Sequence, residues 1–273
     1  QEKLGFFEQM TNSIVDIDKC LLVNDRINSL ISLIREFIKN NRELKSVVIR
    51  SSSNGDTMLI FSGNVSKELL LESFSMVDVI VLNNKLVKGQ FIKEMLGDKE
   101  FLIYPNSFFQ VNNYINLELF NLIKENIVGK TVLDLYSGVG TLSIVASKVV
   151  DKVCSIEVIP NAVKNALINA KINKCDNINF ILGKVEDKIG FINDKIDTII
   201  VDPARAGLDK KTIEVINNIC PQRIIYVSCD TQSLANNLVD LANYEIKKFY
   251  ILDMFSYTYH IECFCILDRK IYK

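Results

Sequence analysis

Three short segments place reactive or ligand-binding side chains at the ends of apolar runs. Cys229 follows the run Tyr226–Ser228, and Asp202 follows the run Thr198–Val201. Upstream, the segment Asp134–Gly140 carries a carboxylate and two glycines at the end of a further apolar run. A thiol, two carboxylates and a glycine turn that lets the backbone approach a ligand would serve nucleophilic catalysis beside a nucleotide-like ligand.

The glycine turn and the acidic residue that follows it indicate which kind of ligand this part of the chain binds. The turn Asp134–Gly140 lacks a full GxGxxG pattern, and no Walker pattern occurs, so phosphate binding is not the favoured use. Glu157 ends the next apolar run, about twenty residues beyond the glycines, where a carboxylate can accept hydrogen bonds from ribose hydroxyls. The alternative is that Glu157 caps the helix expected after Pro160.

The candidate reactive residues in the C-terminal part of the sequence favour covalent methyl transfer to a pyrimidine. C5 of uracil is a poor nucleophile, but a thiolate that adds to C6 turns C5 into an enolate-like carbon. A base must afterwards remove the C5 proton so that the thiol can leave. Cys229 precedes an expected helix whose positive N-terminus would stabilise a thiolate, and Glu262 begins the last apolar run. The alternatives are a buried packing thiol for Cys229 and a solvated strand-edge carboxylate for Glu262.

Composition bounds the class of protein. The 273 residues, 48% of them hydrophobic, can bury a sizeable core in one large or two modest domains. The net charge of −1 excludes a global basic field, so any contact with nucleic acid must be local. No apolar run of about eighteen residues and no signal-peptide pattern occur, so a cytoplasmic, monomeric protein with no membrane partner is expected. The seven cysteines lack the paired spacing of zinc sites.

The second part of the chain alternates strands and helices. Apolar runs typical of buried parallel strands occur at 131–135, 152–156, 178–182, 198–201 and 223–227. Helical stretches at 140–149, 161–173, 210–219 and 231–241 separate most of them. Strands at 246–252 and 261–268 follow with no helix between them, which indicates an antiparallel hairpin. The sequence therefore predicts an α/β domain over 106–273 with a mostly parallel, Rossmann-like sheet and an antiparallel C-terminal hairpin.

Residues 1–105 are predicted to form a smaller α+β domain. A stripe of isoleucines and leucines predicts a helix over 25–39. Apolar runs on both sides of Asn54–Asp56 predict a hairpin over 46–60. A short helix at 66–76 and strands near 77–82 and 101–104 complete the domain.

Five segments in this order resemble the motifs of the RNA 5-methyluridine methyltransferases, namely 108–112, 134–140, 202–207, 228–230 and 253–262. The resemblance runs from about Pro105 to Leu267. It implies a class I methyltransferase domain that uses S-adenosyl-L-methionine as methyl donor.

The resemblance also implies a role for each site residue. Cys229 would be the nucleophile and Glu262 the acceptor of the C5 proton. Asp202, Arg205 and His260 would orient the substrate. The cofactor contacts would fall on Gln110, Asp134, Tyr136, Gly138, Glu157 and Asp202.

The sequence departs from the family pattern in two places. The proline turn has Ala204 where a second proline is more frequent, beside an intact Asp202 and Arg205. Asp230 and Thr231 follow the nucleophile where Asn-Pro is commoner, which puts the start of the next helix in question. His260, the only histidine, is the alternative candidate for the base.

The first residues resemble the central RNA-binding domain of the 23S ribosomal RNA branch of this family. The resemblance lies in Leu4–Phe6 and Val15–Cys20. In many members the cysteine after Val-Asp is the last of four ligands to an iron–sulfur cluster. The other three have no counterpart here, so no metal site is expected in this chain, and Cys20 would ligate a 4Fe-4S cluster only in a longer protein. Residues 1–105 would then be part of that RNA-binding domain and 106–273 the catalytic domain.

The expected function is methyl transfer from S-adenosyl-L-methionine to C5 of a uridine in RNA through a covalent adduct between Cys229 and C6. The segment Val15–Cys20 favours 23S rRNA as the substrate, and transfer RNA is the alternative. An RNA cytosine-C5 methyltransferase usually carries a second cysteine in the proline motif, which Asp202–Ala204 lacks. A catalytically silent RNA-binding factor on the same scaffold is a further alternative. The target uridine would be flipped into the site.

Overall fold

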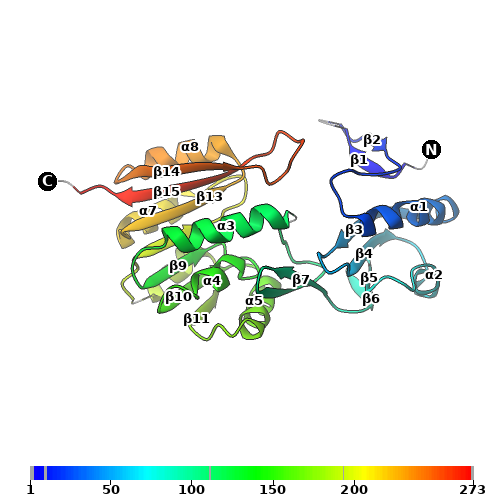
Figure 1. The fold of residues 1–273 in the computed structure, drawn as a ribbon, viewed down its shortest axis with the longest axis horizontal. Coiled ribbons are helices and arrows are strands. Elements are labelled where there is room, and N and C mark those ends of the chain that lie inside the picture. The colour runs from blue at the N-terminus through cyan, green and yellow to red at the C-terminus, as the bar shows by residue number, and fades with distance from the viewer. Residues whose placement is uncertain (1–2, 9–10, 111, 193, 272–273) are drawn as a thin grey trace. The chain divides into compact units, whose positions relative to one another are not determined.

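The computed structural model describes residues 3–8, 11–110, 112–192 and 194–271 (Figure 1). The chain divides into two compact units. The first unit comprises Gln1–Met95 and Leu102–Pro105, and the second comprises Leu96–Phe101 and Asn106–Lys273.

The first unit is built on a four-stranded sheet with two helices. The sheet has the order β3-β4-β5-β6, and only the β4–β5 pair is parallel. Its strands are β3 (Leu44–Ser51), β4 (Thr57–Gly63), β5 (Val79–Leu82) and β6 (Lys85–Lys88). The helices are α1 (Asp25–Asn40) and α2 (Lys67–Ser73), and a separate antiparallel pair joins β1 (Gly5–Phe7) to β2 (Ile14–Asp16). A hairpin of β7 (Ile92–Leu96) and β8 (Lys99–Ile103) has residues in both units.

Local sequence explains α1 and its packing. The Asn24 side chain accepts a hydrogen bond from the backbone N–H of Ile27 and so caps the helix start. The apolar stripe of α1 is buried, and the Phe37 ring lies 4.9 Å from the ring of Phe74. Phe74 is also 5.3 Å from Phe61 on β4. The predicted helix over 25–39 and the hairpin over 46–60 are therefore confirmed.

The second unit contains a seven-stranded sheet of order β11-β10-β9-β12-β13-β15-β14. The five parallel strands are β9 (Thr131–Leu135), β10 (Lys152–Glu157), β11 (Ile178–Leu182), β12 (Thr198–Val201) and β13 (Arg223–Ser228). The hairpin of β14 (Tyr244–Leu252) and β15 (Glu262–Arg269) adds to β13 in antiparallel fashion. The predicted mostly parallel sheet with an antiparallel C-terminal hairpin is confirmed.

Helices cover both faces of this sheet (Figure 1). One face packs against α3 (Asn113–Asn126), α4 (Thr141–Ala146) and α5 (Pro160–Ile172). The other packs against α6 (Val185–Lys188), a 3-10 turn (Ile189–Phe191), α7 (Lys210–Ile219) and α8 (Thr231–Asp240). Successive strand residues alternate between the two cores, as Ile225 and Tyr226 do. Because both faces of the sheet are covered, the central strands β9, β12 and β13 are mostly apolar.

The strand order fixes where a ligand can bind. The chain runs from β9 to β10 on one side and reaches β12 on the other side of β9. At such a reversal the connections diverge, and a crevice opens at the carboxyl ends of the two strands. The sheet of the second unit therefore presents its binding edge at the ends of β9 and β12.

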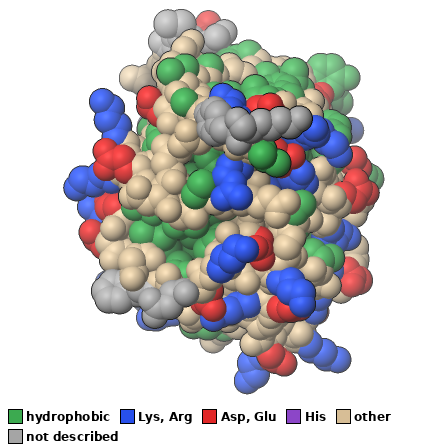
Figure 2. All heavy atoms as spheres, turned by 90° about the vertical axis from the view of Figure 1, so that its left-hand side faces the viewer, with side chains coloured by type: hydrophobic (Ala, Val, Ile, Leu, Met, Phe, Trp, Pro, Cys, Tyr) green, Lys and Arg blue, Asp and Glu red, His purple; other side chains and the backbone are tan. Residues whose placement is uncertain are grey.

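Charges of both signs are mixed on the face of the molecule shown in Figure 2. Figure 2 shows a face on which Lys and Arg side chains are interspersed with Asp and Glu, as the net charge of −1 leads one to expect. Within the described residues, no helix is long and apolar enough to cross a membrane.

Candidate active site

The acidic and thiol residues singled out from the sequence lie at one edge of the second sheet. Asp134 and Glu157 lie at the carboxyl ends of β9 and β10, and Asp202 and Cys229 directly follow β12 and β13. Glu262 is the first residue of β15, and since β15 is antiparallel to β13, its start meets the same edge.

The strand register places the predicted nucleophile and base opposite each other. Ser228 on β13 pairs with Cys263 on β15. Cys229 and Glu262 are the next residues of these two chain segments in the direction of the binding edge. An antiparallel register therefore brings the thiol and the carboxyl together, and Glu262 is close enough to raise the pKa of the Cys229 thiol.

The glycine turn after β9 has room for a ligand at one glycine only. Gly138 adopts a positive φ of 54°, and a Cβ added there would meet nothing within 4 Å. At Gly140, with φ 81°, an added Cβ would lie 3.0 Å from the side chain of Ala166. Gly138 thus leaves open space at the turn, whereas Gly140 allows close packing of α5. Tyr136 also has a positive φ, and its hydroxyl lies within hydrogen-bond distance of Thr212 Oγ1, at 3.2 Å.

Glu157 holds this turn and the start of α5 together. Its Oε2 accepts a hydrogen bond from Gly138 N at 2.9 Å, and its Oε1 accepts one from Ile159 N at 2.7 Å. The helix-start contact that the sequence left as an alternative is therefore present. Each carboxylate oxygen has a second lone pair, so the same group can still accept a hydrogen bond from a hydroxyl.

Asp134 is buried with one oxygen satisfied and the other not. Ser143 Oγ donates to its Oδ2 at 2.5 Å, while Oδ1 has no hydrogen-bond partner. Burial raises the pKa of Asp134 to about 7, and the nearby Asp202 and Glu157 add to the rise. A cationic group against Oδ1 would satisfy that atom and favour the ionised carboxylate.

Unpartnered buried side-chain atoms gather in the predicted motifs. Among the described residues, these atoms are Gln110 Oε1, Asp134 Oδ1, Ser137 Oγ, Asn217 Oδ1 and both carboxyl oxygens of Glu262. Buried polar atoms without a partner are rare and costly. Four of these five residues lie in the segments 108–112, 134–140 and 253–262, so we infer that their missing partners belong to ligands. Val111 of the first segment lies outside the described residues.

Cys229 is a half-buried thiol whose pKa lies above the ordinary value. Burial is the main cause, Glu262 and Asp202 act in the same direction, and Arg205 opposes them. The expectation that a helix N-terminus stabilises a thiolate here is not met. Asp230 caps α8, its carboxylate accepting a hydrogen bond from Ser233 N at 2.7 Å, so a negative charge offsets the positive helix end. The same cap shows that α8 starts normally at Thr231 without the usual Asn-Pro.

Two carboxyl groups beside Cys229 also hold protons more tightly than usual. Burial raises the pKa of Glu262 to about 8, with a further contribution from Asp202. Burial likewise raises the pKa of Asp202 to about 7. At neutral pH these carboxyl groups therefore hold protons that a reaction must remove or pass on.

Arg205 and His260 form a pair at the exposed side of the site. Arg205 Nη2 donates to Nδ1 of His260 at 2.8 Å. A ring nitrogen that accepts from a guanidinium carries no proton, which suits an orienting role for the imidazole. His260 also lies in ring contact with Tyr259 and Phe255.

Two asparagines that the sequence did not single out position the site segments. Asn237 on α8 bonds to both backbone groups of Leu208, at 2.8 and 3.0 Å, and accepts from the Tyr226 hydroxyl at 2.8 Å. It thereby fixes the end of the loop that carries Asp202. Asn112 caps α3 and donates to Met254 O at 3.3 Å, which joins two motifs far apart in sequence. A buried polar residue within a helical stripe is the only sequence signal for Asn237.

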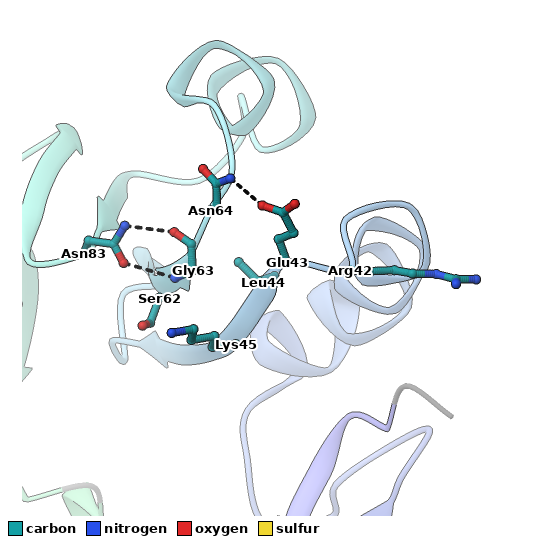
Figure 3. Close-up of a pocket in the computed structure, with 8 residues that line it drawn as sticks. All are labelled: Arg42, Glu43, Leu44, Lys45, Ser62, Gly63, Asn64 and Asn83. Carbon is teal, nitrogen blue, oxygen red and sulfur yellow. Dashed lines mark hydrogen bonds between the residues drawn. The ribbon is translucent and has the colours of Figure 1, made fainter.

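The first unit contains a cavity of about 540 Å³ that holds none of the predicted site residues. Figure 3 shows two of its lining pairs joined by hydrogen bonds. Asn83 exchanges hydrogen bonds with the backbone of Gly63, and the Asn64 side chain donates to Glu43.

Cys20 is a free, half-buried thiol whose backbone is held at both ends by Asn28. The described part of the chain contains no group of three or more His, Cys, Asp or Glu side chains suited to a metal ion.

The architecture and site geometry define a class of protein. Numbered along the chain from β9, the strand order is 3-2-1-4-5-7-6, with helices on both faces and the site at the carboxyl edge. This is the class I methyltransferase fold. Residues 73–270 match the family model described as tRNA (Uracil-5-)-methyltransferase. The chain belongs to this family of RNA uracil-C5 methyltransferases.

Known proteins agree with this assignment. An uncharacterized RNA methyltransferase of Clostridium acetobutylicum is 32% identical over 98% of this chain and 68% of its own length. One of Fusobacterium nucleatum is 31% identical over 98% of this chain and 67% of its own length. The chain thus spans about two thirds of these relatives.

A solved structure extends the similarity to three dimensions. The Pyrococcus abyssi tRNA (uracil-54, C5)-methyltransferase in complex with S-adenosyl-L-homocysteine is 30% identical, with a TM-score of 0.83. The match covers 97% of this chain and 72% of that one. Methanocaldococcus jannaschii Trm5, at 16% identity and a TM-score of 0.59, shares the fold.

Proposed function

We propose that the chain transfers the methyl group of S-adenosyl-L-methionine to C5 of a uridine in RNA through a covalent adduct. The observation that carries this proposal is the placement of Cys229 opposite Glu262 at the edge where the glycine turn opens. A thiol for C6 and a carboxyl for the C5 proton are the two groups that the chemistry requires.

The residues at the ends of β9 and β10 suit the methyl donor. The unpartnered Oδ1 of Asp134 would accept from the ammonium of the methionine part, and Glu157 would accept from the ribose hydroxyls. Gly138 leaves space for close approach, and Gln110 has an unpartnered carbonyl oxygen. Tyr136 and Asp202 complete the proposed contacts. When bound, S-adenosyl-L-methionine supplies an electrophilic methyl group on sulfur.

The first half of the reaction rests on Cys229. The thiol of Cys229 gives its proton to water, and the sulfur forms a bond to C6 while the electrons of the C5=C6 bond move onto C5 and the O4 carbonyl. C5 would then bond to the methyl carbon of the donor, and the electrons of the broken carbon–sulfur bond would stay on the donor sulfur. Arg205 favours the thiolate, because its charge lowers the pKa of Cys229. Asp202, Arg205 and His260 would orient the uracil edge.

The second half rests on Glu262. Its carboxylate takes the proton from C5, the electrons of that bond restore C5=C6, and the bond from C6 to the Cys229 sulfur breaks to release a thiolate. Because the pKa of Glu262 is about 8, the carboxyl must lose its own proton before this step. Removal of the C5 proton therefore depends on pH.

Trapping the adduct tests the proposal. With Glu262→Gln, the reaction should stop after methylation, so that a methylated protein–RNA adduct survives denaturing electrophoresis. Glu245→Gln, an exposed carboxylate on the neighbouring strand β14, is the matched control and should give no adduct. Normal turnover by Glu262→Gln would move the base role to another group, with His260 the first candidate. No methyl transfer by the wild type to any RNA would favour a silent RNA-binding factor.

The RNA substrate forms the finer part of the proposal. We assign 23S rRNA on the resemblance of Val15–Cys20 to that branch, with residues 1–105 as part of an RNA-binding domain and 106–273 as the catalytic domain. Where the gene product carries three further cysteines before Gln1, Cys20 would be the fourth ligand of a 4Fe-4S cluster. The Pyrococcus abyssi relative favours tRNA instead. Mapping of 5-methyluridine after reaction with 23S rRNA and tRNA transcripts decides between them.

A further inference from the structure

The loop between β14 and β15 has a fixed shape next to the proposed base. Thr258 donates from both its backbone N, at 3.1 Å, and its Oγ1, at 2.6 Å, to Phe255 O. Ser256 Oγ donates to Asp253 at 3.0 Å, and His260 N donates to Thr258 Oγ1 at 3.1 Å. These internal bonds preorganise residues 253–261, which end directly before Glu262.

This ordered loop presents tyrosine rings to solvent. Tyr257 is 96% exposed and Tyr259 is 72% exposed. Tyr257 has a positive φ of 62°, a conformation that costs free energy for a residue with a Cβ. Strained backbone that displays a large apolar ring in water indicates a surface that contacts a ligand.

The rings continue into the active site. The ring of Tyr259 lies 4.1 Å from that of His260, centroid to centroid. His260 in turn accepts from Arg205, whose charge acts on Cys229. Contacts therefore lead from Tyr259 through His260 to Arg205, which lies near the proposed nucleophile.

We propose that Tyr257 and Tyr259 form a stacking surface for unpaired RNA bases that flank the target uridine. This inference rests on the proposed function and extends it to the recognition of the RNA strand. A uridine flipped into the site leaves its neighbours without their stacking partner. Aromatic side chains replace such contacts for any base, because every base has a π face.

The test varies the ring and the base together in the full-length gene product. The RNA is a short single strand with one central uridine, and a second RNA carries abasic riboses at the two flanking positions. Tyr257→Ala and Tyr259→Ala should each weaken binding of the first RNA about tenfold, and substitution by Trp should restore it. The wild type should bind the abasic RNA more weakly than the first RNA. The alanine variants should bind the abasic RNA with the same affinity as the wild type does.

Two controls separate this inference from the function on which it rests. Phe249→Ala removes a half-exposed ring on β14, away from the loop, and should leave RNA binding unchanged. All variants should bind S-adenosyl-L-homocysteine like the wild type.

Two results would overturn the inference alone. The first is an RNA affinity that is unchanged in both tyrosine variants. The second is an equal loss of affinity for the abasic RNA, which would point to contacts with the backbone or with a protein. Absence of uridine methylation by the wild type would instead overturn the proposed function.

Discussion

Replacing Glu262 with glutamine should change how the stability of the protein depends on pH. The side chain is 1% exposed, and its folded pKa is about 8 against an ordinary value of 4.5. A carboxyl whose pKa is raised by folding stabilises the folded state below its unfolded pKa. That contribution is lost as pH rises through the folded pKa. Glutamine does not titrate, so the free energy of unfolding of the variant does not decrease in this way as pH rises.

The magnitude follows from the two pKa values. A rise of about 3.5 corresponds to about 5 kcal/mol in full, of which about 4 kcal/mol falls between pH 5 and pH 9. The free energy of unfolding of Glu262→Gln minus that of the wild type should therefore increase by about 4 kcal/mol over this range.

Urea unfolding at several pH values, under reducing conditions, measures this difference. Glu245→Gln serves as the control, because this exposed carboxylate on β14 should leave the pH dependence as it is in the wild type. Burial of the amide in Glu262→Gln should also change the free energy of unfolding by an amount that does not depend on pH. This constant change leaves the pH dependence of the difference unaltered. A change in the difference of less than about 1 kcal/mol between pH 5 and pH 9 would refute a buried, protonated Glu262.

Three further changes test other parts of the site. Cys229→Ala should abolish methyl transfer and keep calorimetric binding of S-adenosyl-L-homocysteine; turnover above a few per cent of wild type would exclude the nucleophile role. Glu157→Ala should weaken that binding by roughly 1.5–3 kcal/mol, about ten- to a hundredfold, since it removes charge-assisted bonds and loosens the turn at Gly138. The single-turnover rate should rise with pH through about 8, because Cys229 and Glu262 must both lose protons. A rate that falls over this range would contradict the proposal that both groups react in their deprotonated forms.

The sequence predicted the strands of the second unit well because both faces of its sheet are buried. Runs such as Thr131–Leu135 and Thr198–Val201 are mostly apolar, and their bounds match β9 and β12. Helix α3 was missed, because buried Asn116 and Asn126 interrupt its apolar stripe. Tertiary contacts satisfy these two: Asn116 donates to Gln110 O, and Lys248 donates to Asn126 Oδ1.

The edge at which the site residues gather followed from strand topology, but their electrostatics did not. The pKa values of Cys229 and Glu262 depend on burial and on side chains brought near only by folding. The bridge of Glu157 between Gly138 and Ile159 likewise depends on backbone groups that a residue pattern does not specify. The strands β1, β2 and β6 are short or exposed, so their sequences lack the apolar run that marks a buried strand. In β7 buried apolar residues alternate with exposed Lys93 and Met95 and with the buried Glu94, so it too lacks such a run.

The pairing of Ser228 with Cys263 has a consequence for how such an enzyme can diversify. The thiol and the carboxyl lie at the end of a ladder of backbone hydrogen bonds between β13 and β15, whereas the segment 253–261, which carries His260, connects β14 to β15. Insertions, deletions or exchanges within that connection can therefore alter what lies over the site while the ladder keeps the two reacting groups in register. The residues that select the substrate and the residues that make and break bonds thus lie on separate stretches of the chain. The first set can change in sequence while the second set keeps its position.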